Sequence, residues 1–310
     1  MDAALFQRFH PDEYYRRFLA DGVRPDGRVP QERRRARVQS GTFAAPCGSA
    51  SVRMGQSAAA AGVRIEVTER TPEQPAVGTI VASVELPPLC SQQFRERSRA
   101  AGVATFLTNA LTEILNSSHV FDPSQLDIRE AEVVWVLRVD VICLNYDGNA
   151  FDLCLLAALA ALEDTKLPAL VEEKDEEKGA ALMDEDVAIK RFVVAPPGTE
   201  ESKIASQVKH VELVSRPLPV TFAQLPGERW VIDPCAAEEG LGASVSLCLL
   251  GGRWLVYHMG GAANTERFLG ELMPIARSYV PELTELLDKA KPLDDAIYMD
   301  VEAKMAPDAL

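Results

Sequence analysis

Residues 132–162 read EVVWVLRVDVICLNYDGNAFDLCLLAALAAL, and this stretch decides the fold. Glu132–Leu144 carries β-branched and aromatic residues on both faces, which predicts a strand buried on both sides. The following Tyr146-Asp147-Gly148-Asn149 has the composition of a turn. Phe151–Leu162 is rich in Ala and Leu, and such small residues allow a helix to pack closely against a sheet. The stretch therefore predicts a buried strand, a turn and a core helix.

Upstream, the chain switches between periods typical of strands and helices. Alternating apolar residues predict two strands around Gly55-Gln56, and Pro87-Pro88 halts a third strand because proline cannot continue a hydrogen-bonded ladder. An amphipathic pattern predicts a short docking helix near the start and a longer helix before the deciding stretch. The segments are 11–21 (helix), Gly48–Val67 (two strands), Ile80–Leu86 (strand) and Ala100–Leu115 (helix).

Downstream, strands again precede a helix. The strand-like segments are Val220–Phe222, Arg229–Asp233, Ser244–Leu250 and Arg253–His258. Gly251-Gly252 predicts a hairpin between the last two. Residues 265–290 predict a helix that is bent or broken at Pro274 and Pro281. Strands followed by helices, twice, predict an α+β protein with two similar halves.

The composition is that of a soluble globular protein, with 47% hydrophobic and 25% charged residues among 310. The longest apolar run, Leu153–Leu162, is about half of the roughly 20 residues that a membrane helix needs, so we expect no membrane contact. The start of the chain lacks signal-peptide features, which favours the cytosol or nucleus. Its six cysteines show neither zinc-ligand spacing nor a disulfide pattern. No metal and no cofactor are predicted.

Charge is distributed unevenly. The formal net charge of -14 argues at first sight against nucleic acid. However, residues 171–186 hold eight acids and two lysines, and we interpret them as a flexible surface loop, so RNA contact elsewhere stays possible. Arg24–Arg37 carries six arginines against Asp26 and Glu32. This run is either a solvated surface or a contact for phosphate or an acidic partner.

Several separated motifs resemble the RNase PH family, and in particular the RNase PH-like subunits of the eukaryotic RNA exosome ring. The motifs, in order, are EYYRRFL at 13–19, RPDGR at 24–28, GSA at 48–50, VRMG at 52–55, LPPLCS at 86–91, VWVL at 134–137, ICL at 142–144 and YDGN at 146–149. The similarity covers about residues 10–165 and resumes from about 210 to 280.

The resemblance implies the RNase PH fold, which is ribosomal protein S5 domain 2-like. It divides the chain into an RNase PH domain 1-like part with the docking helix (1–170), an acidic flexible insertion (171–209), a domain 2-like part (210–290) and a loose tail (291–310). It also implies a heterodimer within a six-membered ring, S1/KH cap subunits, associated exosome ribonucleases and RNA as partners. The implied locations are the nucleus, nucleolus and cytoplasm.

The catalytic groups that the family uses are not matched in this sequence. Where active relatives read Asp-Gly-Gly-Thr-Arg, this chain has Asn149 and Phe151 in the third and fifth places, and phenylalanine cannot bind phosphate as a guanidinium does. The two essential carboxylates fall near Ala237 and Ala243, which cannot hold a metal. Asp233-Pro234 with Glu238-Glu239 is either a turn with a solvated acidic pair or a polar site. No catalytic residue is predicted.

The candidate RNA contacts are Arg95, Arg97 and Arg99. In an extended segment they would share one face and meet successive phosphates, whereas in a helix they would spread around the axis. Solvated or subunit-contact roles stay open. His258 and the turn at 260–264 are interpreted as structural. The sequence therefore favours a noncatalytic ring subunit, with an active phosphate-dependent 3′-5′ exoribonuclease as the alternative and a stand-alone RNA-binding protein as a third reading.

Overall fold

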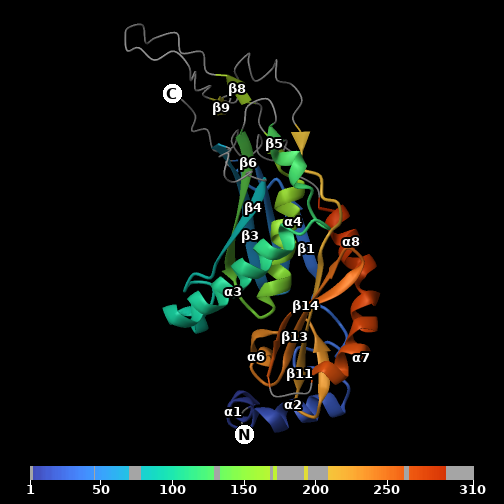
Figure 1. Cartoon of the computed structure of the whole chain (residues 1–310). Coiled ribbons are helices and arrows are strands. Elements are labelled where there is room, and N and C mark those ends of the chain that lie inside the picture. Colours follow the sequence, from blue (N-terminus) through green and yellow to red (C-terminus); the bar gives the residue numbers. More distant parts are fainter. Residues whose placement is uncertain are drawn as a thin grey trace, which may run out of the picture.

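Figure 1 shows a computed structural model of the chain, which describes residues 3–44, 46–69, 78–128, 133–167, 170–172, 192–194, 209–261 and 265–290. Most of the predicted acidic insertion at 171–209 and the whole predicted tail at 291–310 lie outside these residues. The division into four parts therefore stays a prediction.

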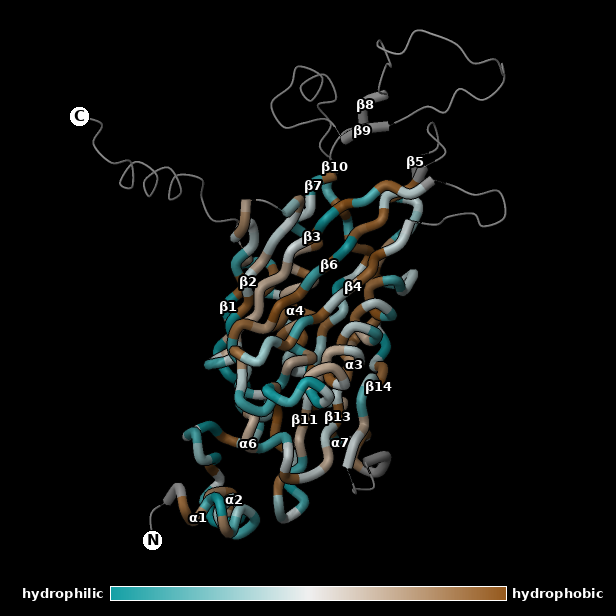
Figure 2. Tube along the Cα trace, turned by 90° about the vertical axis from the view of Figure 1, so that its left-hand side faces the viewer, coloured by the Kyte–Doolittle hydropathy of each residue, from teal (hydrophilic) through white to brown (hydrophobic). Residues whose placement is uncertain are grey.

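The first half is built on a mixed sheet with the strand order β1-β2-β3-β6-β4 (Figure 2). Neighbours in this sheet are antiparallel, except that β4 runs parallel to β6, and the short β5 also pairs with β6. The predicted hairpin at Gly55 and the strands on either side of it are confirmed, whereas β1 was not predicted. The bounds are β1 (Ala36–Ser40), β2 (Gly48–Met54), β3 (Ser57–Glu69), β4 (Thr79–Glu85), β5 (Asp127–Ile128) and β6 (Val133–Asn145).

Both long helices of this half, α3 (Arg97–Leu115) and α4 (Ala150–Glu163), lie on one face of the sheet. α4 packs across β2, β3 and β6, and α3 lies along β4. The predicted core helix is confirmed, because α4 is buried along nearly its whole length. The predicted burial of the 132–144 strand on both faces is wrong. Ile142 and Leu144 are 41% and 55% exposed, since no described helix covers the other face.

The edge of β4 that faces away from β6 is capped by side chains of α3. Alternate backbone amides of β4 donate to oxygens spaced four residues apart on the helix, which therefore lie on one helix face. These bonds are Val84 N to Thr108 Oγ1 (3.0 Å), Ala82 N to Thr112 Oγ1 (3.2 Å) and Ile80 N to Asn116 Oδ1 (2.9 Å). This edge is thus closed to another strand.

The second half is an antiparallel sheet with the order β12-β11-β13-β14. The predicted hairpin is confirmed, because Gly251 and Gly252 both have positive φ (53° and 81°), as a two-residue hairpin of type I′ requires. A helical turn, α6, follows β12. The bounds are β11 (Leu218–Leu225), β12 (Arg229–Ile232), α6 (Ala236–Glu239), β13 (Ser244–Leu250) and β14 (Arg253–Gly260).

The predicted C-terminal helix is two helices, α7 (Thr265–Ser278) and α8 (Val280–Asp288). The chain breaks at Tyr279, just before Pro281, which occupies the first turn of α8 where a missing N–H costs nothing. Pro274 lies inside α7 and does not end it. None of the described helices is long and apolar enough to cross a membrane.

The docking helix near the start is confirmed as α2 (Pro11–Ala20), which buries Tyr15 and Leu19 against the second sheet. A further helix, α1 (Ala3–Phe9), precedes it. α4 also contacts β11, so the two sheets share one core. The remaining short elements are η1 (Gln92–Phe94), η2 (Pro123–Leu126), β7 (Lys166–Leu167), β8 (Leu170–Glu172), β9 (Phe192–Val194) and β10 (Lys209–His210).

Candidate functional site

A cavity of about 620 Å³ opens between the two halves of the molecule. Its walls come from α3, the first turn of α4, β11, α6, β13 and β14, so residues far apart in sequence meet there. This volume lies in the range of roughly 300–1,000 Å³ that is usual for small-molecule sites. Asn149 and Phe151 both line this cavity. They are the two positions that the sequence analysis compared with the family's phosphate site.

Asn149 has a structural position at the start of α4. It adopts the left-handed conformation (φ 59°) and caps the helix, with its side-chain oxygen accepting from the amide of Asp152. Its side-chain amide donates to Asp152 Oδ2 at 2.9 Å and to Asp233 Oδ1 at 2.8 Å. With both groups of its side chain used and 1% of its surface exposed, Asn149 has little left to offer a ligand.

Phe151 is the second residue of α4 and is 5% exposed. Its ring stacks on Tyr257 of β14, with the centroids 6.0 Å apart and the planes at 30°. Stacking of this kind stabilises the contact between the two halves beyond the apolar area that it buries. An aromatic packing residue therefore occupies the place where the resemblance puts a phosphate-binding arginine.

The two alanines that were aligned with the family's carboxylates do not line the cavity, but their neighbours do. Ala237 is exposed on α6 and Ala243 is 2% exposed in the core. The adjacent Ala236 and Ser244 are the residues that face the cavity. Neither side chain carries a charge, so a shift of the alignment by one residue does not restore a carboxylate.

Few charged groups face this cavity. Among the described residues, Arg99 is the one guanidinium in its wall, and that side chain is exposed at the surface. His258 is half-buried with its ring edge against Phe106, and burial lowers its pKa, which favours the neutral imidazole at pH 7. The described residues form no group of three or more metal-binding side chains.

Glu239 is the acid in the cavity wall, and its carboxylate is already engaged. It accepts hydrogen bonds from the Tyr146 hydroxyl and, at 2.6 Å, from the backbone amide of Asn149. Burial raises its pKa, and these two bonds oppose that rise by favouring the carboxylate. Glu239 therefore ties α6 to the turn before α4, and the prediction of a solvated acidic pair is wrong.

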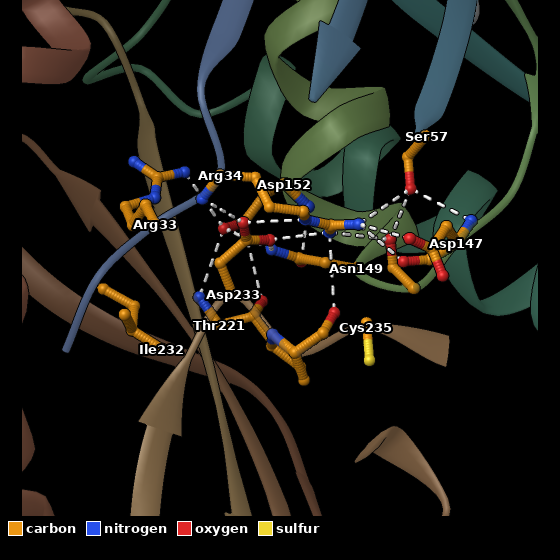
Figure 3. A network of polar contacts seen from close by, with 12 residues as sticks. Arg33, Arg34, Ser57, Asp147, Asn149, Asp152, Thr221, Ile232, Asp233 and Cys235 are labelled. Carbon is orange, nitrogen blue, oxygen red and sulfur yellow. Dashed lines mark hydrogen bonds and ion pairs between the residues drawn. The ribbon is translucent and has the colours of Figure 1, made fainter. Parts of the chain in front are cut away.

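Behind the cavity, Arg34 and Asp233 form a buried ion pair (Figure 3). The Asp233 carboxylate accepts from Arg34 Nε at 2.9 Å, from Nη2 at 2.8 Å and from the Arg34 backbone amide at 2.9 Å. The Arg34 hydrogen bonds hold the pKa of Asp233 below its usual value of 3.8, against the effect of burial. Arg34 also donates to the carbonyls of Asp147 and Gly148, so it joins the turn before α4 to the turn after β12.

Asp152 extends the same network to β11. Its carboxylate accepts from Thr221 Oγ1 at 2.7 Å and lies 3.5 Å from the Arg33 guanidinium. Complete burial raises its pKa, whereas Arg33 and the hydrogen bonds favour the charged form. Arg24, which is 1% exposed, forms a separate ion pair with Glu238 of α6.

These contacts correct the interpretation of the Arg24–Arg37 run. Arg24, Arg28 and Arg33 are at most 9% exposed and are paired with acids, so for them both a solvated surface and a free phosphate contact are wrong. Arg35 and Arg37 are exposed, as a basic surface run predicts. The sequence missed the pairing because Arg24 and Glu238 lie 214 residues apart, which leaves no local signal.

The three candidate RNA contacts are all exposed but do not share one face. α3 begins at Arg97, which places Arg97 and Arg99 about 200° apart around the helix, and Arg95 precedes that helix. The extended arrangement is therefore not found. Arg99 alone of the three lines the cavity, and whether any of them binds RNA stays a prediction. The structural interpretation of the 260–264 turn falls partly outside the described residues.

Comparison with known proteins places this geometry in context. Residues 32–168 match the RNase PH model, described as the 3′ exoribonuclease family, domain 1. An exosome complex component rrp43 from Schizosaccharomyces pombe is 35% identical over 175 residues, which is 56% of this chain and 64% of that protein. An exosome complex component Rrp42 from Methanothermobacter thermautotrophicus is 30% identical over 270 residues, covering 86% and 90%.

Solved structures agree. A chain of the Archaeoglobus fulgidus exosome with RNA bound to the active site superimposes with a TM-score of 0.67 at 25% identity, over 88% of this chain and 96% of that one. A chain of an archaeal exosome core gives a TM-score of 0.65 over 93% and 99%. These matches confirm the predicted fold class.

Proposed function

The chain belongs to the family of RNase PH-like exosome core components, and from this we propose that it is a noncatalytic structural subunit of an RNA exosome ring. In this role it builds part of the central channel through which RNA passes to 3′-5′ processing and degradation. Among ring subunits we propose that it corresponds to exosome component eight, on the motifs quoted from its sequence.

The observation that carries the proposal is the position of Phe151. In active relatives the resemblance puts an arginine here to bind phosphate, and the side chain in this protein is instead buried against Tyr257. A phosphorolytic site needs several cations around inorganic phosphate. In the described cavity wall Arg99 and the largely neutral His258 are the cationic candidates, which supports the absence of activity.

The buried network supports the same proposal from another side. Arg34 and Asp233 neutralise each other, and Asn149 bonds two aspartates, so these groups hold the fold together and are not free for substrate. The proposed partners are RNase PH-like subunits in a heterodimer within a six-membered ring, S1/KH cap subunits, exosome ribonucleases and RNA. The proposed locations are the nucleus, nucleolus and cytoplasm.

Two measurements test the proposal together. Tagged chain is purified from its native cell and its partners are identified by mass spectrometry, and purified chain is incubated with a labelled oligoribonucleotide and inorganic phosphate. We expect ring and cap subunits to co-purify and no nucleoside diphosphate to be released. Phe151→Arg, checked for a normal melting temperature, is expected to leave phosphorolysis of the eluate unchanged.

An active enzyme would give the opposite results. Phosphate-dependent shortening of the oligonucleotide by the isolated chain, lost on heating, would establish the alternative of a 3′-5′ exoribonuclease. Recovery of the chain alone as a stable monomer would instead favour a stand-alone RNA-binding protein.

A further inference from the structure

The cavity between the two halves combines apolar and hydrogen-bonding side chains. α3 contributes Val103 and Phe106, which lie three residues apart and therefore on one face of the helix. The second sheet contributes Ser246 of β13 and His258 of β14, which are paired directly across the two strands. Paired residues of neighbouring strands point to the same side of a sheet, with their Cβ atoms about 5 Å apart. A molecule in this cavity therefore meets both kinds of side chain.

The ring of His258 has hydrogen-bonding capacity that the described residues do not use. Its imidazole lies edge-on to Phe106, with the ring centroids 5.4 Å apart, and burial alone accounts for the shift in its pKa. Within the described parts of the chain, neither ring nitrogen has a hydrogen-bond partner. A neutral imidazole offers one N–H donor and one acceptor nitrogen. Because His258 lines the cavity, both are available to a molecule bound there.

Ser246 offers an acceptor because of the number of protons in its surroundings. The Thr221 hydroxyl lies 2.7 Å from Asp152 Oδ1 and 3.1 Å from Ser246 Oγ, and it carries a single proton. The Asp152 carboxylate takes that proton, since an anionic acceptor at the shorter distance forms the stronger bond. The proton between the two hydroxyls is then that of Ser246. Lone pairs of the buried Ser246 Oγ are left to accept from a ligand.

The charges around the cavity disfavour an anionic ligand. Glu239 lies in the wall and is held as a carboxylate by two hydrogen bonds. Arg99, the one guanidinium among the described wall residues, is exposed, so solvent and salt screen it. Arg34 lies behind the cavity and is already paired with Asp233. A phosphate in the cavity would be repelled by Glu239 without a free buried cation beside it, whereas an uncharged ligand avoids that repulsion.

We propose that this cavity binds an uncharged ring compound that carries N–H and O–H groups, of the chemical class of a nucleoside without phosphate. The ring packs against the apolar side chains of α3, an N–H or O–H group of the ligand donates to Ser246, and His258 bonds to the edge of the ligand. The inference rests on the proposed loss of the phosphate site and adds to it what the altered cavity accepts instead.

The test measures binding to the full chain by isothermal titration calorimetry, with adenosine and uridine as probes. Each nucleoside is compared with its 5′-monophosphate and with a dinucleotide that carries the same nucleoside at its 3′ end. We expect both nucleosides to bind, and a phosphate in either form to weaken binding about tenfold or more. Ser246→Ala is expected to weaken nucleoside binding about three- to tenfold, since one hydrogen bond to the ligand is lost.

Gly102→Leu fills part of the cavity without straining the backbone. Gly102 lines the cavity, a Cβ at this position would meet no atom within 4 Å, and leucine forms helices more readily than glycine. The matched control is Gly270→Leu, at a glycine of α7 that is equally open and lies outside the cavity. We expect Gly102→Leu to weaken nucleoside binding about tenfold or more and Gly270→Leu to leave it unchanged. Neither variant should lower the melting temperature of the parent chain.

Four results would contradict the inference. Absence of nucleoside binding at millimolar concentration overturns it, and so does binding that Gly102→Leu leaves unchanged. A monophosphate that binds as tightly as its nucleoside shows that the cavity still accepts phosphate, which also overturns it. A dinucleotide that binds more tightly assigns the cavity to the end of an RNA chain and overturns the choice of a free nucleoside. The noncatalytic ring proposal is tested separately, by co-purification and by the phosphorolysis assay.

Discussion

Asp233→Asn is the substitution that most directly tests the buried network. The change keeps the shape of the side chain and removes its charge, at a position that is 1% exposed. In the parent protein each carboxylate oxygen accepts two bonds at 2.8–2.9 Å, three in all from Arg34 and one from Asn149. In the variant one oxygen becomes an NH₂ group that faces two donors, and the buried Arg34 loses its closest counterion and keeps only the longer ion pair with Asp147 at 3.6 Å.

The size of the effect follows from these contacts. Breaking a buried ion pair by removing one partner costs about 3–5 kcal/mol, because the remaining charge is left uncompensated in a medium of low dielectric constant. Domains are stable by only about 5–15 kcal/mol, so this is about a fifth or more of the total. The expected loss is therefore far larger than that of a surface ion pair, which contributes about 0–1 kcal/mol.

The measurement is urea unfolding followed by circular dichroism, with Asp140→Asn as the control. Asp140 forms an ion pair with Arg64 at 2.6 Å in which the side chains are 33% and 64% exposed, so the same substitution there should cost less than about 1 kcal/mol. If Asp233→Asn shifts the unfolding free energy no more than Asp140→Asn does, the network does not join the two halves and the reasoning is refuted.

The pH dependence gives a second, independent check on Asp233. Its pKa in the folded protein is lowered below 3.8, chiefly because the Arg34 hydrogen bonds outweigh the effect of burial, so its contribution is fully present above the unfolded value. That contribution is lost as the pH falls from about 4 through the folded value. The stability difference between the parent chain and Asp233→Asn should therefore be constant from about pH 5 to 7 and shrink in acid. A difference that grows below pH 4 would contradict the sign.

Three further predictions concern the turn, the cavity and the surface. Gly148→Ala should lower the free energy of unfolding in urea by about 3 kcal/mol or more, because φ is +82° and the new Cβ would lie 2.5 Å from backbone atoms of the 234–235 turn. The control is Gly27→Ala, where φ is +88° but the space is open, and it should lower the same free energy by about 1–2 kcal/mol. Tyr146→Phe should destabilise by about 1.5–3 kcal/mol in the same assay, since the buried Glu239 carboxylate loses a donor. Replacing the three candidate RNA-binding arginines by Ala should lower the salt dependence of RNA binding to the assembled ring, measured by fluorescence anisotropy, by up to about two in the slope of log K against log salt.

Much of the fold could be predicted from local sequence because each element is specified by its own residues. The Ala- and Leu-rich stretch after Asn149 predicted α4, and Gly251-Gly252 predicted the last hairpin. Both predictions succeed because the spacing of apolar residues and the tolerance of glycine for positive φ are properties of the local sequence. Burial of β6 was overestimated for a physical reason. Ile142 and Leu144 are apolar on a face that nothing described in this chain covers, so the residue pattern alone cannot say where a covering layer stops.

The site could be predicted only in part. The turn at Asn149 and Phe151 was found because the motif around it is contiguous, and the structure brings both residues to the cavity. The contributions of β13 and β14 were missed, since Ser246 and His258 reach the cavity through strand pairing that follows no sequence motif. The prediction that Arg95, Arg97 and Arg99 share one extended face is wrong. The spacing of apolar residues predicts a helix from Ala100, whereas α3 begins at Arg97.

The arginine run at the start of the chain shows why net charge is a poor guide to function in this protein. Arg24, Arg33 and Arg34 each meet an acid contributed by a distant turn or helix, and those acids are Glu238, Asp152 and Asp233. A buried guanidinium must be paired because leaving it alone costs several kcal/mol, so these arginines cannot turn outward to phosphate without unfolding the site. The positive charge of these three arginines is thus used to join two halves of the fold, so the arginine run is not by itself a sign of phosphate contact.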